Sequence, residues 1–326
     1  MNIERDTTWQ ARTDRVAWGI RKRVLEHTIK SNGGYLSQAC SSAEILATLY
    51  VEIMKLGPSQ SAAIPPPFRG VPSKDNPHPL TGAAFNGPHA PELDRFFLSP
   101  AHYALAVYAA LIEVERMAPE GLAMFNQDGS TVEMIGAEHS PGMEVTSGSL
   151  GQTLSQAAGV ALARRLNGDS GRVWVFMSDG EFQSGQTWEA MQALAFYRLD
   201  HVGIYVDVNG QQCDGKMDEV MKIEPLFDRL AAFGARVSRV NGHDVDALRA
   251  ASDYLPDGRP LVVLAYTNPC QGLDLLEARR PKLHYVRFQN EAERKEFAAA
   301  LSEMLGHKAK TFGRGLTRIN ADKRIE

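Results

Sequence analysis

Three residues follow two apolar stretches at positions where their oxygen atoms could bind a metal ion. Asp179 lies in the Ser-Asp-Gly turn that ends the apolar run 173–177, and Asn209 follows the apolar run 202–208. With a nearby main-chain carbonyl, for which Gln211 is the candidate, they form a partial shell of oxygens. Mg²⁺ prefers six oxygens and is usually held by a few protein groups and substrate phosphates. We therefore expect Asp179, Asn209 and Gln211 to bind Mg²⁺, or Ca²⁺ or Mn²⁺ in its place, together with a diphosphate.

The segments around these residues predict one βαβ unit. Both apolar runs are typical of short strands that are buried on both faces, and residues 187–199 carry apolar side chains at helical spacing. A right-handed crossover makes the two strands parallel. Open parallel sheets bind ligands beyond the carboxyl ends of their strands, where Asp179 and Asn209 would meet. Gly180 would let the backbone approach phosphate oxygens without a Cβ in the way.

The spacing of these two turns resembles the thiamine diphosphate motif, and in detail the chain resembles transketolases. Either dipeptide, Asp-Gly or Asn-Gly, is by itself typical of a plain turn. Residues 178–180 are Ser-Asp-Gly and residues 207–209 are Asp-Val-Asn, where the family usually has Gly-Asp-Gly and Asp-Asn-Asn or Asp-Asp-Asn. The two presumed metal ligands therefore match, and the outer positions differ. The resemblance also implies that Glu181 lies beside the cofactor and Cys213 near its thiazolium.

Two histidines lie where the family places histidines that face the diphosphate. His102 follows Asp-Arg-Phe-Phe-Leu-Ser at residues 94–99, which resembles the family's Asp-Arg-Phe-x-Leu-Ser-x-x-His. His284 is the candidate in the loop after the predicted strand 260–266, although its neighbours differ from the family's Trp-His-Gly. By resemblance, both would donate hydrogen bonds to the diphosphate or the substrate and could move protons.

Residues 138–152 form a further block that resembles the family's His-x-Pro-Gly-x-Glu-x-x-x-Gly-x-Leu-Gly-Gln. By that resemblance His139 faces the substrate, while Gly148 and Leu150 hold the aminopyrimidine and thiazolium side of the cofactor. A glycine-rich loop that opens a helix of small residues also permits close backbone packing.

Two departures from the family concern the substrate and the coupling of active sites. A family histidine that faces cofactor and substrate falls here at Ser31 or Asn32, and a glutamate that communicates between sites falls at Ser184. The resemblance therefore implies the family's fold and cofactor, with an unusual substrate, altered coupling or reduced activity.

Composition excludes several other classes of protein. The 326 residues are 44% hydrophobic and 23% charged, which is typical of a globular chain, and the net charge of −4 gives no electrostatic reason to expect nucleic acid or a membrane surface. Three distant cysteines indicate neither a disulfide framework nor a zinc site. We find no apolar run of membrane-spanning length and no signal peptide, and we expect a cytoplasmic enzyme.

The predicted fold is α/β, a doubly wound, mostly parallel sheet flanked by helices, as in thiamine diphosphate-binding modules. A helical part at 1–56 would contain an amphipathic helix at 8–29 and a second helix, capped by Ser41 or Ser42, that runs to about Met54. The remaining parts would be a proline-rich irregular insertion at 57–93, the α/β core at 94–290, and a C-terminal helix and tail at 291–326, basic and mobile from His307.

The resemblance implies a transketolase-type transferase of aldehyde or ketone residues. It spans residues 8–285 and covers only the diphosphate-binding half of a full-length transketolase. We therefore expect a second subunit that carries the pyrimidine-binding domain and its activating glutamate, in an α2β2 heterotetramer. The complex would transfer a two-carbon ketol unit from a ketose, a sugar phosphate in our reading, to an aldehyde.

Three alternatives stay open at this point. The α subunit of a thiamine-dependent 2-oxoacid dehydrogenase shares the cofactor and the split arrangement, but the His102 and His139 blocks favour transketolase. The second alternative is a non-catalytic or regulatory paralogue, and the retention of all the presumed metal ligands argues against it. An unrelated nucleotide-binding α/β protein would be expected to show a Gly-x-Gly-x-x-Gly or Walker-type loop, which we do not find.

Overall fold

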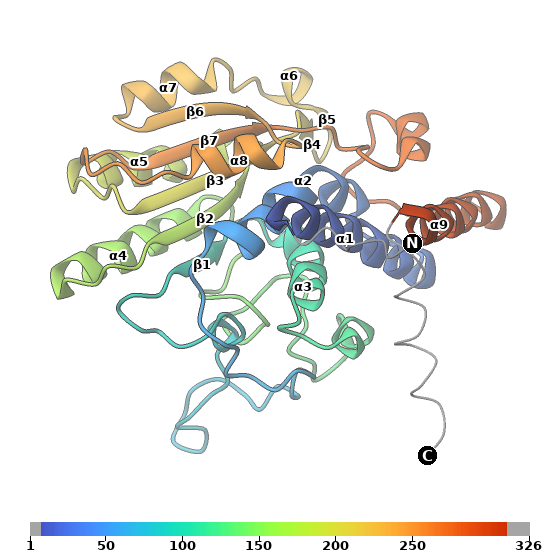
Figure 1. The fold of residues 1–326 in the computed structure, drawn as a ribbon, viewed down its shortest axis with the longest axis horizontal. Helices are drawn as coiled ribbons and strands as arrows, with labels where there is room; N and C mark the ends of the chain where they lie inside the picture. Colours follow the sequence, from blue (N-terminus) through green and yellow to red (C-terminus); the bar gives the residue numbers. More distant parts are fainter. Residues whose placement is uncertain (1–7, 312–326) are drawn as a thin grey trace.

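A sheet of five parallel strands forms the centre of the computed structural model, which describes residues 8–311 (Figure 1). The strands lie in the order β1, β2, β3, β7, β6, and each neighbouring pair is parallel. Their bounds are β1 Arg95–Leu98, β2 Val173–Ser178, β3 Val202–Val208, β6 Arg236–Asn241 and β7 Leu261–Tyr266. Helix α5 (Gly185–Phe196) connects β2 to its neighbour β3, so the predicted βαβ unit is confirmed.

Alternate strand residues enter two separate hydrophobic cores, because successive side chains of a strand point to opposite faces. In β2, Trp174 and Phe176 belong to the first core, and Val175 and Met177 belong to the second. The first face is covered by α1 (Trp9–Ser31), α2 (Leu36–Thr48), α3 (Ala104–Glu113) and α8 (Val245–Ala251). The second face is covered by α4 (Gln152–Asn167), α5 and α7 (Leu226–Ala232). The predicted doubly wound α/β class is therefore confirmed.

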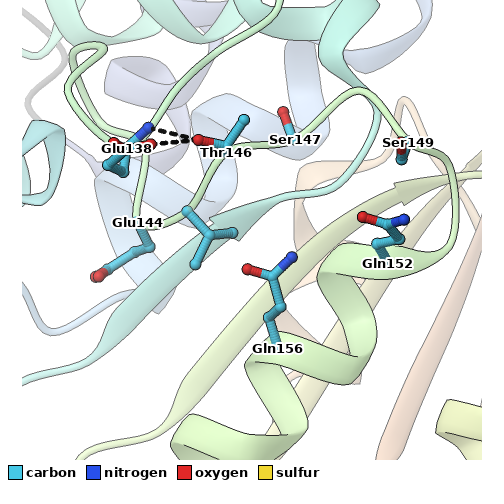
Figure 2. A pocket seen from close by; sticks show the side chains of 8 residues that line it. Glu138, Glu144, Thr146, Ser147, Ser149, Gln152 and Gln156 are labelled. Carbon is cyan, nitrogen blue, oxygen red and sulfur yellow. Dashed lines mark hydrogen bonds between the residues drawn. The ribbon is translucent and has the colours of Figure 1, made fainter. Parts of the chain in front are cut away.

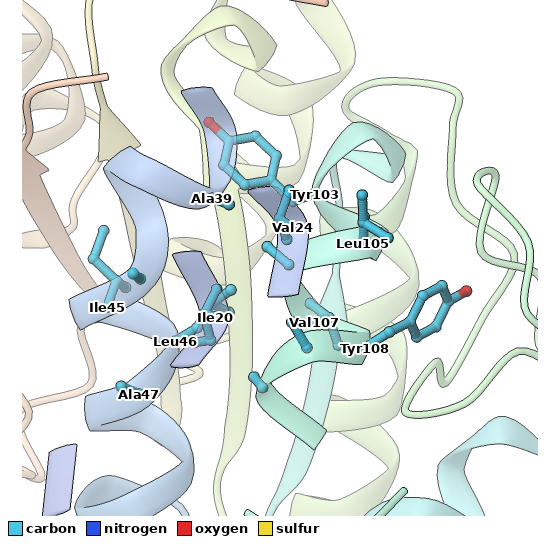
Figure 3. Close-up of a cluster of buried hydrophobic side chains, with 14 of the residues drawn as sticks. Ile20, Val24, Ala39, Ile45, Leu46, Ala47, Tyr103, Leu105, Val107 and Tyr108 are labelled. Atoms are coloured by element: carbon cyan, nitrogen blue, oxygen red, sulfur yellow. The ribbon is translucent and has the colours of Figure 1, made fainter. Parts of the chain in front are cut away.

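The first core is built largely from the helices α1, α2 and α3 (Figure 3). Ile20 and Val24 of α1 lie with Leu46 of α2 and Val107 of α3 in one buried cluster. Each such side chain contributes roughly 1.5–3 kcal/mol when fully buried. This packing fixes α2 and the start of α3 against the carboxyl ends of the strands, where the candidate site lies.

The second predicted helix begins earlier than expected. Helix α2 starts at Leu36, so Ser41 and Ser42 do not cap it but lie in its second turn, where the Ser42 hydroxyl donates to the Gln38 carbonyl at 2.6 Å. Tyr35 is the N-cap residue and makes no side-chain capping bond. Every residue of α2 is buried, and tertiary packing therefore sets its start in place of a local cap.

The remaining elements are short or lie at the C-terminal end. The helical ones are the π-helical turn Leu49–Ile53, the 3₁₀ turns Gly82–Asn86, Ala101–Tyr103, Pro119–Met124, Asp179–Gln183 and Asp274–Arg279, and helices α6 (Met217–Val220) and α9 (Glu291–Thr311). Strands β4 (Gln211–Gln212) and β5 (Gly215–Lys216), which sequence analysis missed, form an antiparallel hairpin. Most of the segment 57–93 is irregular.

The C-terminal helix runs further than predicted. Helix α9 continues past His307 to Thr311, and the rest of the predicted tail, residues 312–326, lies outside the described residues. Among residues 8–311, no helix has both the length and the apolar character that a membrane crossing requires.

Gly203 of β3 gives Trp174 of β2 the space that it needs. A Cβ on Gly203 would lie 2.2 Å from the indole ring. Trp174 is 1% exposed, and its indole N–H donates to Asp94 at 2.9 Å, so the ring has no room to move away. A side chain at residue 203 would therefore disturb the centre of the sheet.

We predict that Gly203→Ala destabilises the chain by roughly 1–3 kcal/mol, the usual cost of overpacking a core. Urea unfolding followed by circular dichroism measures this change. Gly159→Ala in α4 is the matched control, because a Cβ there meets nothing within 4 Å and alanine favours a helix over glycine by about 0.5–1 kcal/mol. Equal stabilities of Gly203→Ala and the unsubstituted chain would contradict the packing argument.

Candidate active site

The carboxyl ends of β2 and β3 bring Asp179 and the segment 209–211 together. The Asp179 carboxylate accepts the Gly180 N–H and the Gly210 N–H, both at 2.8 Å. The Asn209 side-chain oxygen accepts the Gln211 N–H at 2.9 Å. The predicted metal ligands therefore occupy one place in the structure.

A buried carboxylate behind this place orients Asn209. Asp207 is fully buried and accepts hydrogen bonds from four side chains: Ser41 Oγ (2.5 Å), Thr267 Oγ1 (2.5 Å), Tyr103 Oη (2.7 Å) and Asn209 Nδ2 (3.1 Å). Asn209 Nδ2 also donates to the Tyr103 hydroxyl at 3.0 Å. Because Asp207 and Tyr103 hold the amide nitrogen, the carboxamide oxygen points the other way. Sequence analysis assigned Asp207, Tyr103 and Thr267 no role, and it gave Ser41 only the role of a candidate helix cap.

The electrostatics of Asp179 suit a bound cation. Burial and the neighbouring Asp207 carboxyl raise the pKa of Asp179 to about 8, and burial also raises the pKa of Asp207. Two buried acids beside each other are costly to ionise, and a divalent ion would offset that cost. Within residues 8–311, no group of three His, Cys, Asp or Glu side chains is placed to hold a metal, so an ion at Asp179 would depend on amide and carbonyl oxygens and on a diphosphate.

Gln211 has an available main-chain carbonyl. The Met217 N–H donates to the Gly210 carbonyl at 2.9 Å, and Gln211 lies opposite Lys216 in the hairpin. In antiparallel strands, residue pairs that share hydrogen bonds alternate with pairs that make none. Gly210 and Met217 form a bonded pair, so the next pair, Gln211 and Lys216, makes no ladder hydrogen bonds. In addition, the Gln211 side-chain oxygen is buried and has no hydrogen-bond partner in the described structure. The residues present therefore fit a hard divalent ion.

The structure brings His102 and His284 together. Their ring centroids are 4.9 Å apart, and the His102 ring lies 4.8 Å from Tyr103, which binds Asp207. Burial, and next the neighbouring His284, lower the pKa of His102 to about 3, so this imidazole is neutral at physiological pH. Neither ring nitrogen of His102 has a hydrogen-bond partner among the residues described, which leaves both free for a ligand.

Helix α2 fixes the orientation of His284. The Gln38 side-chain nitrogen donates to the His284 carbonyl at 3.0 Å and lies 3.3 Å from its Nδ1. Since an amide nitrogen can only donate, Nδ1 accepts and the proton resides on Nε2. Burial lowers the pKa of His284 as well. His102 and His284 are therefore neutral hydrogen-bonding groups.

His139 has different surroundings. Its ring lies 4.3 Å from the ring of Phe68, which belongs to the proline-rich segment, and its Nε2 lies 3.3 Å from a Glu133 oxygen. None of its described contacts involves His102 or His284. The structure thus does not join His139 to the pair of histidines beside Tyr103, and its predicted role stays a prediction.

Glu181 ties the predicted cofactor loop to the end of β2. Its buried carboxylate accepts from Ser99 Oγ (2.5 Å), the Ser178 N–H (3.0 Å) and the Gly151 N–H (3.2 Å). Burial raises the pKa of Glu181 to about 7 despite these hydrogen bonds. Glu181 therefore positions the loop from within the protein, and its predicted contact with the cofactor stays a prediction.

The other predicted cofactor residues lie on surfaces. Gly148 has φ +111°, a conformation that favours glycine, and Leu150 is 40% exposed. Cys213 is exposed at the tip of the β4–β5 hairpin. A Cβ on Gly180 would meet nothing nearer than 3.6 Å, an ordinary van der Waals contact, so no protein contact requires glycine there.

A polar pocket of about 470 Å³ lies beside the loop 147–149 (Figure 2). Its lining residues are Glu138, Glu144, Val145, Thr146, Ser147, Ser149, Gln152 and Gln156. The Thr146 hydroxyl accepts from the Glu138 N–H and donates to its carboxylate, which closes the loop (Figure 2). The pocket is lined by none of Asp179, His102 or His284, so it is separate from the candidate site.

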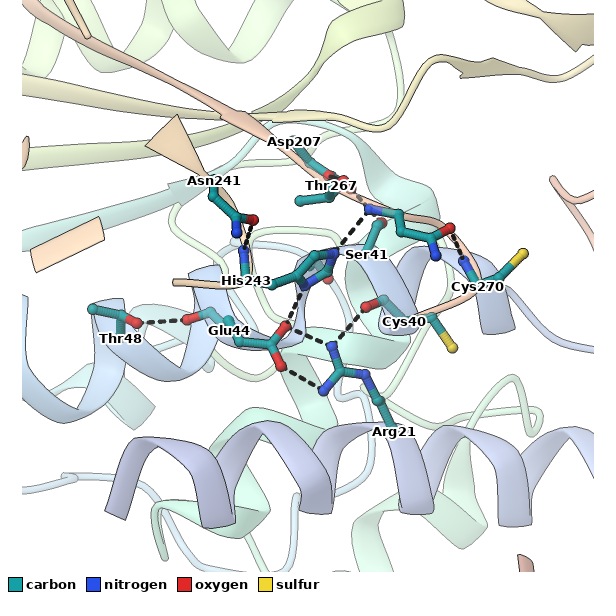
Figure 4. Close-up of polar contacts among 12 residues, drawn as sticks. Arg21, Cys40, Ser41, Glu44, Thr48, Asp207, Asn241, His243, Thr267 and Cys270 are labelled. Carbon is teal, nitrogen blue, oxygen red and sulfur yellow. Dashed lines mark hydrogen bonds and ion pairs between the residues drawn. The ribbon is translucent and has the colours of Figure 1, made fainter. Parts of the chain in front are cut away.

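A second polar network supports the loops around the site (Figure 4). Glu44 of α2 pairs with Arg21 at 2.5 Å and with His243 Nδ1 at 2.8 Å, and His243 Nε2 accepts the Asn268 N–H at 2.8 Å. Burial alone would raise the pKa of Glu44, but His243 and Arg21 lower it to about 2. This ionised carboxylate fixes the loop that follows β7.

Comparisons with known proteins agree with this geometry. Residues 82–267 match the family described as "Transketolase, thiamine diphosphate binding domain". The chain is 35% identical over 286 residues to an uncharacterized transketolase family protein of Sinorhizobium fredii, with 86% of this chain and 91% of that protein covered. It is 31% identical over 263 residues to the 6-deoxy-6-sulfo-D-fructose transketolase subunit SqwG of a Clostridium species, covering 80% of this chain and 86% of that subunit.

A solved structure shows the same fold. The transketolase from Campylobacter jejuni matches with a TM-score of 0.66 and 20% identity over 95% of this chain. Only 48% of that transketolase is covered, so the chain spans about half the length of this solved relative.

We predict that, without metal or cofactor, stability falls as the pH rises towards about 8. Asp179 has a pKa of about 8 in the folded chain, against about 3.9 in an unfolded chain. The folded state therefore binds more protons in this window, and stability is lost as the pH rises through it. Urea unfolding in EDTA at several pH values measures the slope.

Asp179→Asn should flatten that slope most clearly between about pH 7 and 8. Glu181, with a pKa of about 7, contributes less to the change of stability with pH in this window. Asp253→Asn is the control, because its carboxylate is exposed at the far end of the sheet and should leave the slope unchanged. The same slope in Asp179→Asn as in the unsubstituted chain would refute the raised pKa.

Proposed function

Because the chain belongs to the transketolase family, we propose that it is the diphosphate-binding subunit of a split transketolase. In this proposal it transfers a two-carbon ketol unit from a ketose to an aldehyde. The observation that carries the proposal is the placement of Asp179 and Asn209 at adjacent strand ends, beside the neutral pair His102 and His284.

The chain's own residues would hold the cofactor and orient the substrate. Asp179, Asn209 and the Gln211 carbonyl would bind Mg²⁺, and the metal would bind the diphosphate. Thiamine diphosphate, when bound, supplies the electron sink for breaking and forming the C–C bond. His102 and His284 would donate hydrogen bonds to phosphate or substrate oxygens and could pass a proton to or from the substrate. We propose the same proton transfer for His139, facing the substrate in the assembled complex.

A partner subunit supports the same reading. A relative of similar length carries the word "subunit" in its name, and the solved transketolase contains about as much chain again. We propose a second subunit with the pyrimidine-binding domain in an α2β2 complex located in the cytoplasm. Gly148 and Leu150 would then face the cofactor at the interface, with Cys213 close to the thiazolium.

The substrate is proposed only as a class. The named relative acts on a sulfonated ketose, 6-deoxy-6-sulfo-D-fructose. A phosphorylated or sulfonated ketose is therefore the donor that we propose, and the changes at Ser31, Asn32 and Ser184 distinguish this chain from the usual family pattern.

We predict graded losses of cofactor affinity in the purified complex. Asp179→Asn removes a metal ligand and should weaken Mg²⁺-dependent thiamine diphosphate binding at least about 100-fold, whereas Tyr103→Phe removes a group that orients Asn209 and should weaken it about tenfold. Isothermal titration calorimetry with and without EDTA measures both. Asp253→Asn again serves as the control. Unchanged affinity in Asp179→Asn would reject the metal assignment.

We also predict that the chain copurifies with a second subunit and that the complex has transketolase activity. Native mass spectrometry of the complex from its own source, with Mg²⁺ and thiamine diphosphate, tests assembly. Product analysis with D-xylulose 5-phosphate, D-fructose 6-phosphate and 6-deoxy-6-sulfo-D-fructose tests transfer. Acyl transfer to lipoyl acceptors would favour the 2-oxoacid dehydrogenase, and a complex without cofactor would favour a regulatory paralogue.

A further inference from the structure

Tyr35 lies between the two histidines of the candidate site and the segment that follows His284. Its ring centroid is 5.9 Å from His102, 5.5 Å from His284 and 5.0 Å from Tyr285. We propose that Tyr35 contacts the substrate and that its hydroxyl binds a hydroxyl or carbonyl oxygen of the sugar. This inference rests on the proposed transketolase function and adds a specificity residue to it.

Backbone and side-chain contacts hold Tyr35 in place. Gly34 exchanges two hydrogen bonds with Val286, at 3.0 and 2.9 Å, and Ser37 Oγ donates to the Leu283 carbonyl at 2.7 Å. Gly33 makes this approach possible, because a Cβ there would lie 2.4 Å from the Tyr285 hydroxyl. The segment that carries Tyr35 is therefore fastened to the segment that carries His284, and the two side chains keep a fixed separation.

The hydroxyl of Tyr35 is available to a ligand. The ring is partly buried, and the hydroxyl has no hydrogen-bond partner among the residues that the structure describes. Burial raises its pKa, with further contributions from Tyr285 and Cys213, so the phenol stays protonated at physiological pH.

The residues at the family's histidine position do not take this place. Asn32 adopts a left-handed conformation at the end of α1, and its side-chain oxygen accepts the Phe288 N–H at 3.1 Å. Ser31 is exposed at the last position of the same helix. Neither contacts His102 or His284 in the described structure, whereas Tyr35 contacts both. A neutral phenol in place of an imidazole would supply hydrogen bonding that does not titrate near neutral pH.

The test compares Tyr35→Phe with the unsubstituted subunit in the assembled, cofactor-loaded complex. The ring contacts remain, and only the hydroxyl is lost. The donor is whichever of D-xylulose 5-phosphate, D-fructose 6-phosphate and 6-deoxy-6-sulfo-D-fructose gives the unsubstituted complex the highest kcat/KM. With this donor we expect Tyr35→Phe to lower kcat/KM about tenfold, the effect of losing one hydrogen bond. Thiamine diphosphate affinity and thermal stability should not change. Tyr254→Phe, at the opposite end of the sheet, is the matched control and should have no effect.

A second variant separates contact with the substrate from a structural role. Tyr35→His keeps a hydrogen-bonding ring, so it should recover activity relative to Tyr35→Phe and add a new ionisation near neutral pH to the kcat/KM profile. Unchanged kcat/KM in Tyr35→Phe, in a complex that binds cofactor and transfers ketol units, would overturn the role of Tyr35 alone. A complex that binds no thiamine diphosphate would overturn the proposed function and this inference together.

Discussion

The buried carboxyl of Asp207 is the constraint on which the candidate site depends. A buried polar group is costly unless its hydrogen bonds are made, and here four donors satisfy one carboxyl. Three of them lie 60 or more residues away in sequence, on α2, at the start of α3 and after β7. The end of β3 is therefore stable only when these elements have assembled around it. The same hydrogen bonds turn the Asn209 oxygen away from Asp207, so the contacts that stabilise the fold here also orient a predicted metal ligand.

Helix α2 connects this constraint to the rest of the site. Gln38, Ser41 and Glu44 are spaced three residues apart, so they lie on one side of the helix. Gln38 binds His284, Ser41 binds Asp207 and Glu44 binds His243. One helix thus sets the positions of three segments that lie far apart in the sequence. Its complete burial explains why it begins without a side-chain cap.

Local patterns in the sequence predicted the parts of this arrangement that depend on neighbours in the chain. The strand at 202–208 was predicted with its observed bounds, and the meeting of Asp179 and Asn209 followed from one βαβ unit. Contacts between distant segments could not be predicted in the same way. The available signal for Asp207 was an acid between Val206 and Val208 in an otherwise apolar strand, but nothing local indicated Tyr103 or Thr267 as its partners.

The same limit applies to the helix start and to His139. Ser41 and Ser42 have the residue type of a helix cap, yet the burial of the whole segment moves the start to Leu36. The contact of His139 with Phe68 depends on the path of a proline-rich segment that has no periodicity to predict it. The family resemblance predicts residue types at a site, whereas their contacts depend on how such irregular segments fold.

Four groups of the candidate site, two acids and two histidines, have pKa values shifted in one direction, towards the neutral form of each group. The pKa of Asp179 and Glu181 is raised, and the pKa of His102 and His284 is lowered, with burial as the first cause in each case. A divalent ion at Asp179 would reverse the shift of that acid but would disfavour protonation of the histidines further. Loading the site would therefore ionise the metal ligand while the imidazoles stay neutral. That combination, an anionic ligand beside neutral donors, is suited to hold a metal diphosphate without placing a competing cation next to the substrate.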